Sequence, residues 1–161
     1  MQPQIVERKQ AYAVGLGKSF APQDSQAIKA LWDEFSKRAH EIESQSEIAY
    51  GVCAADHPEI KFEENCCMVY VAAKEAEADT AVPPGMVKVK LESGAYARFT
   101  HRGPIDEIGS TVGYIWGEWQ PQAPYQRRSA PDFELYDHRF DPASQSSEVD
   151  IYVPLERIEE D

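Results

Sequence analysis

The residues with the clearest chemical potential lie in one short segment, Pro131-Asp132-Phe133-Glu134-Leu135-Tyr136. Polar and apolar side chains alternate along it, as they do on a strand with two different faces. Glu134 and Tyr136 then share one face, and Phe133 and Leu135 share the other. A carboxylate among aromatic rings can serve as the counter-ion of an organic cation, or it can accept a hydrogen bond from a neighbouring tyrosine. The segment alone leaves both interpretations open.

Length and composition indicate one globular domain spanning residues 1–161. The chain is 42% hydrophobic and 27% charged, a balance that supports a core of ordinary size. It lacks the run of about 18 apolar residues that a membrane span needs, and its N-terminus lacks the apolar region of a signal peptide. Its net charge of -12 argues against direct nucleic-acid binding, which needs clustered basic residues. We therefore expect a cytoplasmic protein with neither a membrane nor nucleic acid as a direct partner.

Cysteine and histidine positions give no metal or cofactor motif. Cys66 and Cys67 are adjacent and Cys53 lies apart, and an odd number of cysteines is typical of a reducing compartment. The four histidines lack the spacing of a zinc-binding helix, and the chain has neither a glycine-rich phosphate loop nor a nucleophile elbow. We expect no metal and no cofactor.

Two parts of the chain show the same order of expected elements: strand, helix, strand, strand. In the first part, apolar residues from Ile28 to Ile42 recur at spacings of three and four, which predicts an amphipathic helix of roughly five turns. In the second part, Gly103-Pro104 and the acids after it are typical of a helix N-terminus, and this helix is expected to end near Gln120. The expected strands are about 5–16, 48–53, 66–72, 86–100, 132–136 and 149–153. The expected boundaries are about 4–76 for repeat one, 77–85 for a linker and 86–155 for repeat two.

A constant offset of 84 residues supports the repeat. It aligns Trp32 with Trp116 without a gap, and it aligns Tyr50 with Glu134. Duplicated units of this kind are expected to pair about a pseudo-twofold axis, with the helices covering one side of a mainly antiparallel sheet. The predicted fold class is therefore α+β, built from duplicated strand-helix-strand-strand units.

The direction of the strand side chains depends on which apolar face meets the helices. We expect the helix-facing residues to be Phe133, Leu135, Ile151 and Val153. Glu134 would then face away from the helices, in the company of four strand tyrosines, Tyr50, Tyr70, Tyr136 and Tyr152. Otherwise these tyrosines are half-exposed strand residues, which is common for Tyr.

Several motifs together resemble a known family. They are Gly94-Ala95-Tyr96-Ala97-Arg98-Phe99-Thr100-His101-Arg102-Gly103-Pro104, Ile115-Trp116-Gly117-Glu118-Trp119, Asp132-Phe133-Glu134-Leu135-Tyr136 and Val149-Asp150-Ile151-Tyr152-Val153-Pro154. In order and spacing they are similar to the GyrI-like small-molecule-binding domain, also called the AraC-type bacterial effector-binding domain. The resemblance covers nearly the whole chain and is strongest from residue 84 to residue 154. It implies a duplicated fold with a ligand cleft between the halves.

The resemblance also implies a ligand and a site. In multidrug-sensing members, a strand glutamate within an aromatic pocket holds cationic, lipophilic ligands, and Glu134 occupies the matching position. The aromatic partners vary within the family, so the candidates follow from the expected facing: Tyr50, Tyr70, Tyr136, Tyr152, Trp116 and Trp119. The two tryptophans could equally belong to the core.

We therefore predict a stand-alone protein that binds cationic aromatic small molecules. The chain shows no predicted helix-turn-helix, so a transcription regulator or another protein would be a separate partner. One alternative is a GyrI-like hydrolase that detoxifies electrophilic compounds with Glu134 and a tyrosine. Another is a protein-inhibitory module that acts through its acidic surface.

Overall fold

The computed structural model describes residues 2–21 and 24–159 and has the predicted α+β fold. Its strands are β1 (Gln4–Arg8), β2 (Ala11–Phe20), β3 (Ala49–Ala54), β4 (Met68–Ala76), β5 (Val87–Leu91), β6 (Gly94–Arg102), β7 (Tyr125–Arg127), β8 (Asp132–Tyr136) and β9 (Glu148–Arg157). Its helices are α1 (Ser25–Ser36) and α2 (Ile108–Gly117), with 3-10 turns at Ala39–Glu41 and Ile105–Glu107. In the described part of the chain, no helix is long and apolar enough to cross a membrane.

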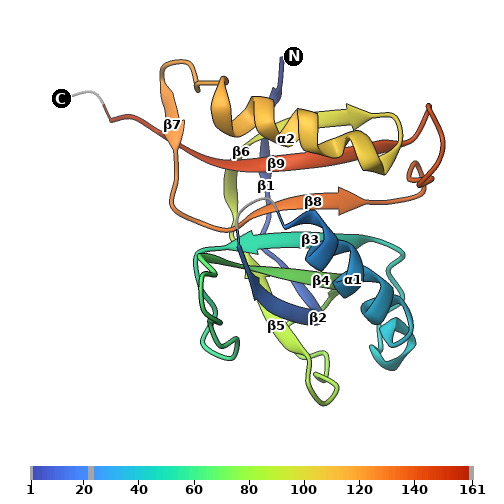
Figure 1. The fold of residues 1–161 in the computed structure, drawn as a ribbon. Helices are drawn as coiled ribbons and strands as arrows, with labels where there is room; N and C mark the ends of the chain where they lie inside the picture. Colours follow the sequence, from blue (N-terminus) through green and yellow to red (C-terminus); the bar gives the residue numbers. More distant parts are fainter. Residues whose placement is uncertain (1, 22–23, 160–161) are drawn as a thin grey trace.

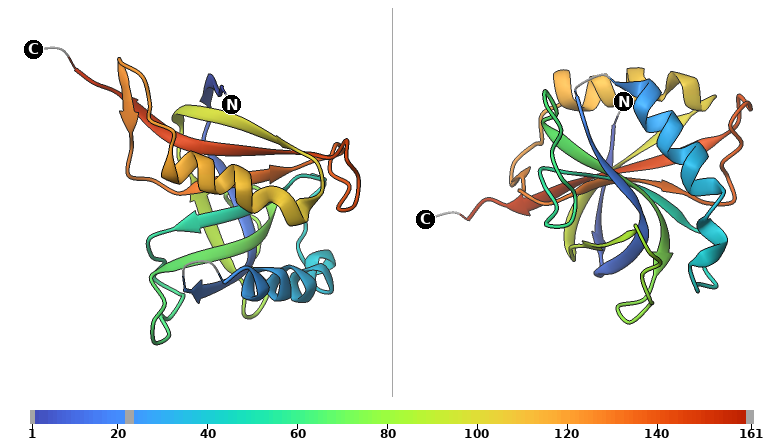
Figure 2. Two further views of the ribbon diagram at one scale, coloured as in Figure 1. Left: turned by 45° about the horizontal axis from the view of Figure 1, so that its top comes forward. Right: turned by 60° about the horizontal axis from the view of Figure 1, so that its bottom comes forward.

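The strands form one antiparallel sheet that curls into a half-barrel (Figure 1 and Figure 2). Its order is β1-β6-β9-β8-β3-β4-β2-β5, and β7 pairs with β9. β1 pairs with β6 of the second half of the chain, and β5 pairs with β2 of the first half. Each half therefore contributes an edge strand to the other half. β3 and β8 form the junction in the middle of the sheet.

Both helices lie on one face of the sheet, which we call the helix face. Leu31 and Phe35 of α1 are buried in one core with residues of β2 and β4. Ile115 of α2 is buried in another core with residues of β6 and β9. In the sheet order, β8 and β3 lie between the strands against which the two helices pack (Figure 1). These two strands are therefore where a site between the helices would lie.

A row of paired residues crosses the sheet on the helix face. Ile151 pairs with Glu134, Glu134 with Gly51, Gly51 with Ala72, and Ala72 with Leu16. Ile151 belongs to the α2 core, and Ala72 and Leu16 belong to the α1 core. Glu134 therefore lies on the helix face, so the prediction that it faces away from the helices is wrong.

The face of the sheet opposite the helices is also buried, because it forms the inside of the half-barrel. Phe133 and Leu135 belong to this core, so the prediction that they face the helices is wrong as well. Ile151 and Val153 do pack in the core that contains α2, as predicted. Alternation shows which residues share a face, but with both faces apolar it cannot show which face meets the helices.

Both helices are shorter than their apolar patterns predicted. α1 ends at Ser36, and a 3-10 turn then brings Ile42 into the same core. The second helical segment begins as a 3-10 turn and becomes α-helical at Ile108. The apolar pattern in the sequence indicates which residues are buried. Buried residues continue beyond the end of the regular helix, so the pattern is longer than the helix.

Candidate functional site

Glu134 is the centre of a hydrogen-bonded group on the helix face. Its Oε1 accepts hydrogen bonds from the hydroxyl groups of Tyr70 and Tyr136, each 2.8 Å long. The Tyr70 hydroxyl in turn accepts a hydrogen bond of 2.9 Å from the indole Nε1 of Trp32 on α1. We call these four residues the Glu134 cluster. The structure thus places Tyr70 and Tyr136 beside Glu134, as expected, and adds Trp32, which belongs to the apolar pattern of the first predicted helix and was not a predicted site residue.

Gly51 makes this arrangement possible. It is the partner of Glu134 on β3, and a Cβ atom at this position would lie 2.0 Å from the Tyr70 hydroxyl oxygen and 2.5 Å from Glu134 Oε1. Only a residue without a side chain leaves room for the phenol to reach the carboxylate. Gly51 was not among the predicted site residues, although a glycine inside an apolar strand often marks a close approach of another group to the backbone.

Aromatic rings surround the Glu134 carboxylate. The Trp32 ring lies 5.2 Å from the Tyr136 ring and 6.4 Å from the Tyr70 ring, centroid to centroid, in edge-on contacts. Phe140 extends the group through an edge contact of 4.9 Å with Tyr136. Among the described residues, no group donates a hydrogen bond to the second carboxylate oxygen, Oε2. A positive ligand between these rings could approach Oε2 while the ring faces supply cation-π attraction.

Burial weakens the acids on this part of the sheet. It raises the pKa of Glu134 above its ordinary value, although hydrogen bonds from Tyr136 and Tyr70 oppose the shift. Burial also raises the pKa of Asp132 to about 7, and the charge of Glu134 adds to the increase. A positive ligand would restore the stabilisation that these carboxylates lose when water is removed.

Tyr50 and Tyr152 lie on the opposite face from Glu134, in the core inside the half-barrel. The Tyr50 hydroxyl donates a 2.6 Å hydrogen bond to Glu75 and accepts one of 3.0 Å from Arg8. Tyr152 stacks on Phe133, with ring centroids 4.9 Å apart. The expectation that these two tyrosines share a face with Glu134 is wrong, because Phe133 is the partner of Tyr152 across β8 and β9.

Trp116 lies on α2, and Trp119 follows the end of this helix. Neither indole donates a hydrogen bond to Glu134. Trp119 packs with the α2 core, and its ring meets that of Phe99 at 5.0 Å. Trp116 is 47% exposed. The Arg127 guanidinium lies over both indoles, 4.7 Å from the Trp116 ring and 5.3 Å from the Trp119 ring. Trp119 is therefore a partly buried residue that packs against the α2 core, and Trp116 is a surface ring.

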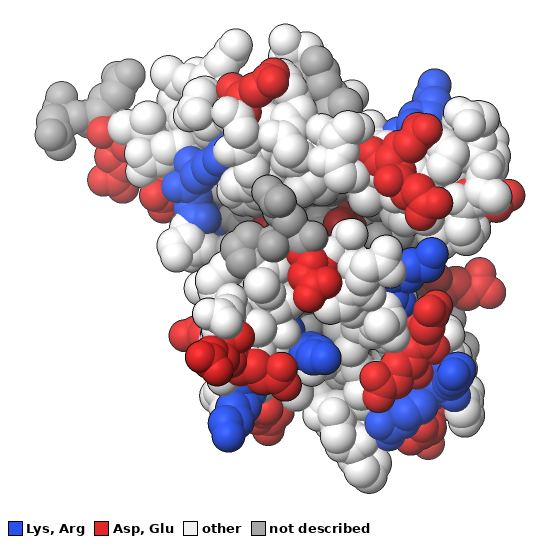
Figure 3. All heavy atoms as spheres, in the orientation of Figure 1, with Lys and Arg blue, Asp and Glu red and all other residues white. Residues whose placement is uncertain are grey.

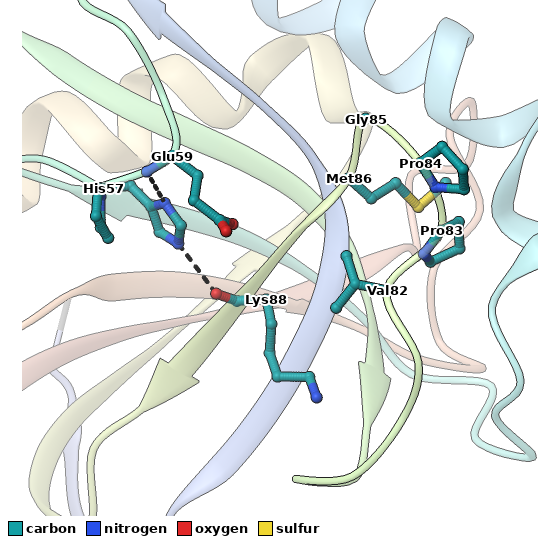
Figure 4. A pocket seen from close by; sticks show the side chains of 9 residues that line it. His57, Glu59, Val82, Pro83, Pro84, Gly85, Met86 and Lys88 are labelled. Atoms are coloured by element: carbon teal, nitrogen blue, oxygen red, sulfur yellow. Dashed lines mark hydrogen bonds between the residues drawn. The ribbon is translucent and has the colours of Figure 1, made fainter.

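Two open depressions in the described surface lie away from the Glu134 cluster. One, of about 710 Å³, lies between the loop after β3 and the segment that leads into β5 (Figure 4). There the Nδ1 of His57 accepts a hydrogen bond of 3.1 Å from the Glu59 amide, and Nε2 lies 3.0 Å from the Lys88 carbonyl oxygen. The other, of about 670 Å³, lies beside the C-terminal end of β4. At the Glu134 cluster itself Trp32 contacts Tyr136, so a ligand that enters must separate these rings.

Acidic residues outnumber basic ones in this chain. In the orientation of Figure 1, acidic side chains cover more of the surface than basic ones (Figure 3). This agrees with the net charge of -12. Such a surface attracts cations at long range and repels anions.

Comparison with known proteins shows the family to which this chain belongs. The model of the GyrI-like small molecule binding domain matches residues 1–156. The chain belongs to the GyrI-like family. This GyrI-like protein is 34% identical over 158 residues to the transcriptional regulator BrlR of Pseudomonas aeruginosa. The match covers 96% of this chain and 56% of BrlR, so the GyrI-like chain spans about half the length of that relative.

Solved structures share the GyrI-like fold. SAV2435 bound to tetraphenylphosphonium matches with a TM-score of 0.67 and 19% identity, over 97% of this chain and 94% of that one. An integron cassette protein from the mobile metagenome of Vibrio cholerae matches with a TM-score of 0.67 and 18% identity, over 97% of each chain. EcmrR, in a complex with DNA, matches with a TM-score of 0.63 and 16% identity, over 98% of this chain and 58% of that one.

Proposed function

We propose that this GyrI-like protein binds lipophilic aromatic cations at the Glu134 cluster. The observation that carries the proposal is the state of the Glu134 carboxylate. One oxygen is fixed by two tyrosines, and the other accepts no hydrogen bond from the described residues. Burial raises the pKa of this carboxyl group, so a positive charge beside it would favour its ionised form. The ligand of SAV2435, a lipophilic cation, supports the same ligand class here.

The contacts available to such a ligand set the expected affinity. Each ring face over a cation contributes about 0.5 to 2 kcal/mol, and the buried carboxylate supplies the opposite charge. Part of this energy is used to move Trp32 away from Tyr136, which lowers the apparent affinity. We expect micromolar dissociation constants, about -8 kcal/mol.

We also propose that residues 1–161 act as one ligand-binding domain made of two repeats, about 4–76 and 86–155, joined by a linker. The pairing of Gly51 with Glu134 supports this, because the cluster needs both halves. The relative BrlR is a transcriptional regulator. A regulator acting as a separate partner would be a route from ligand binding to a response.

A charge-matched titration tests the proposal. Tryptophan fluorescence would be followed with tetraphenylphosphonium, with tetraphenylborate as its anionic isostere, and with neutral triphenylphosphine oxide. We expect micromolar binding of the cation and at least about tenfold weaker binding of the other two. Equal binding of all three would contradict a site built on a carboxylate.

Hydrolysis of an electrophilic substrate is the competing proposal, because Glu134 has two phenols as neighbours. It requires the carboxylate to activate water, whereas binding requires only its charge. Turnover of a model epoxide by the wild type, lost in Glu134→Gln, would favour the hydrolase. Cation binding without any turnover would favour the binding protein.

A further inference from the structure

A second carboxylate lies beside the Glu134 cluster. Asp132 precedes Glu134 by two residues on β8, so the two side chains leave the strand on the same face. Their partners on β3 are Cys53 and Gly51. Residues two apart on a strand are separated by about 7 Å. The helix face of β8 therefore presents two acids at a fixed spacing.

Among the described residues, no counter-ion contacts Asp132. Apart from its own backbone amide, no group among the described residues donates a hydrogen bond to its carboxylate. Arg127 is near enough for its charge to lower the pKa of Asp132, but only as a minor effect. The guanidinium is held elsewhere: its NH2 group donates to the carbonyl oxygens of Ile115 (2.6 Å) and Trp119 (3.0 Å). Asp132 is thus a partly buried acid that no cation of the described chain contacts directly.

The surroundings of this acid pair suit an organic ligand better than a metal ion. Among the described residues, no three His, Cys, Asp or Glu side chains are placed to hold a metal. Aromatic rings lie on the Glu134 side of the pair, where Trp32 and Tyr136 meet edge-on. Flat, delocalised cations are weakly hydrated and gain from such rings.

We infer that Asp132 is a specificity residue that makes the site selective for flat aromatic dications, with two positive centres about 7 Å apart. This inference rests on the proposed cation site and deepens it. Glu134 holds one positive centre of the ligand, and Asp132 holds the other. A monocation satisfies Glu134 alone and leaves Asp132 without a partner.

A matched pair of ligands tests the inference. 1,1′-Dimethyl-4,4′-bipyridinium is a flat dication whose two nitrogens have about this spacing, and 1-methyl-4-phenylpyridinium has nearly the same shape with one charge. Both would be titrated at pH 8 by calorimetry into the wild type, Asp132→Asn and Glu134→Gln. We expect the dication to bind the wild type about tenfold more tightly than the monocation. In Asp132→Asn this advantage should shrink to about twofold, while monocation affinity changes less than twofold.

The outcomes separate this inference from the function on which it rests. If the monocation binds and depends on Glu134, but Asp132→Asn weakens both ligands equally or neither, Asp132 is not a specificity residue and the inference is wrong. If neither ligand nor tetraphenylphosphonium binds the wild type, the proposed function itself is wrong. Because Asp132 has a pKa of about 7, dication binding at pH 7 should also release more protons than monocation binding. Equal proton release by the two ligands would count against the role of Asp132.

Discussion

Gly51 and Glu134 are partners across β3 and β8, and the Tyr70 hydroxyl reaches Glu134 Oε1 through the space that a side chain at position 51 would fill. The two residues come from different halves of the chain. The position of the carboxylate therefore depends on the lack of a side chain at position 51 as well as on the hydrogen bonds that the carboxylate accepts.

Gly51→Ala should disrupt the Glu134 cluster, because the added Cβ would lie 2.0 Å from the Tyr70 hydroxyl. We expect a loss of about 1 to 3 kcal/mol in the free energy of unfolding and at least about tenfold weaker tetraphenylphosphonium binding. Denaturant unfolding and fluorescence titration measure the two effects. Gly113→Ala is the matched control, since nothing lies within 4 Å of its Cβ. It should bind normally and gain up to about 1 kcal/mol in this helix; normal binding by Gly51→Ala would contradict the assigned role of Gly51.

Two tyrosine substitutions test which face of the sheet binds the ligand. Tyr50→Phe removes the hydroxyl that contacts Glu75 and Arg8, so it should cost about 1 to 2 kcal/mol of stability and leave cation affinity within about twofold. Tyr70→Phe removes a donor to Glu134, which makes ionisation harder, and should weaken cation binding at pH 7 by about three- to tenfold. Titration of both variants with tetraphenylphosphonium shows which of the two hydroxyl groups affects cation affinity. A larger loss of affinity in Tyr50→Phe would place the site on the other face.

Trp32 should report ligand entry. Its ring contacts Tyr136 and its indole donates to Tyr70, so a cation that separates the rings changes its surroundings directly. We expect Trp32→Phe to abolish most of the ligand-induced change in tryptophan fluorescence. Trp119→Phe is the control, because Trp119 packs against Phe99 in the α2 core. The opposite pattern would mean that the ligand binds near α2.

The ligand-free protein should lose stability as pH rises through the neutral range. Burial raises the folded-state pKa of Asp132 from 3.8 to about 7 and raises that of Glu134 above 4.5. At these two sites the folded state then binds more protons than the unfolded state above about pH 4, so their contribution to stability is greatest at low pH and falls until the folded-state pKa values are passed. For Asp132 the effect is at most about 4 kcal/mol. Asp132→Asn and Glu134→Gln should each flatten this dependence in thermal unfolding from pH 4 to 9; an unchanged profile in both would show that neither acid is desolvated.

The sequence predicted the fold class, the alternation on β8 and the meeting of Glu134 with Tyr70 and Tyr136. It did not predict which face of the sheet meets the helices, because both faces are apolar. The offset of 84 aligns Tyr50 with Glu134, although these two residues lie on opposite faces. A shift of one residue reverses the face of every strand side chain. The same offset does align Leu31 with Ile115, both buried in helices.

The remaining errors concern contacts between elements that are distant in the sequence. Trp32 belongs to the apolar pattern of the first helix, and that spacing cannot show that its indole reaches a strand tyrosine 38 residues away. Tyr152 was assigned to the site because it alternates like a site residue. Only the register of β8 with β9 shows that it stacks on Phe133 instead.

If the ionised Glu134 is the counter-ion of the ligand, cation affinity must depend on pH. The dissociation constant of tetraphenylphosphonium would be measured from pH 5 to 8 for the wild type, Glu134→Gln and Glu64→Gln, the last of which removes an exposed acid far along the chain from Glu134. Because the cation binds the ionised carboxylate, wild-type affinity should rise with pH up to the raised pKa of Glu134 and then level off. Glu64→Gln should follow the wild type, and Glu134→Gln should bind at least about tenfold more weakly at pH 8 with a flatter profile. Wild-type affinity and pH dependence in Glu134→Gln would contradict the account.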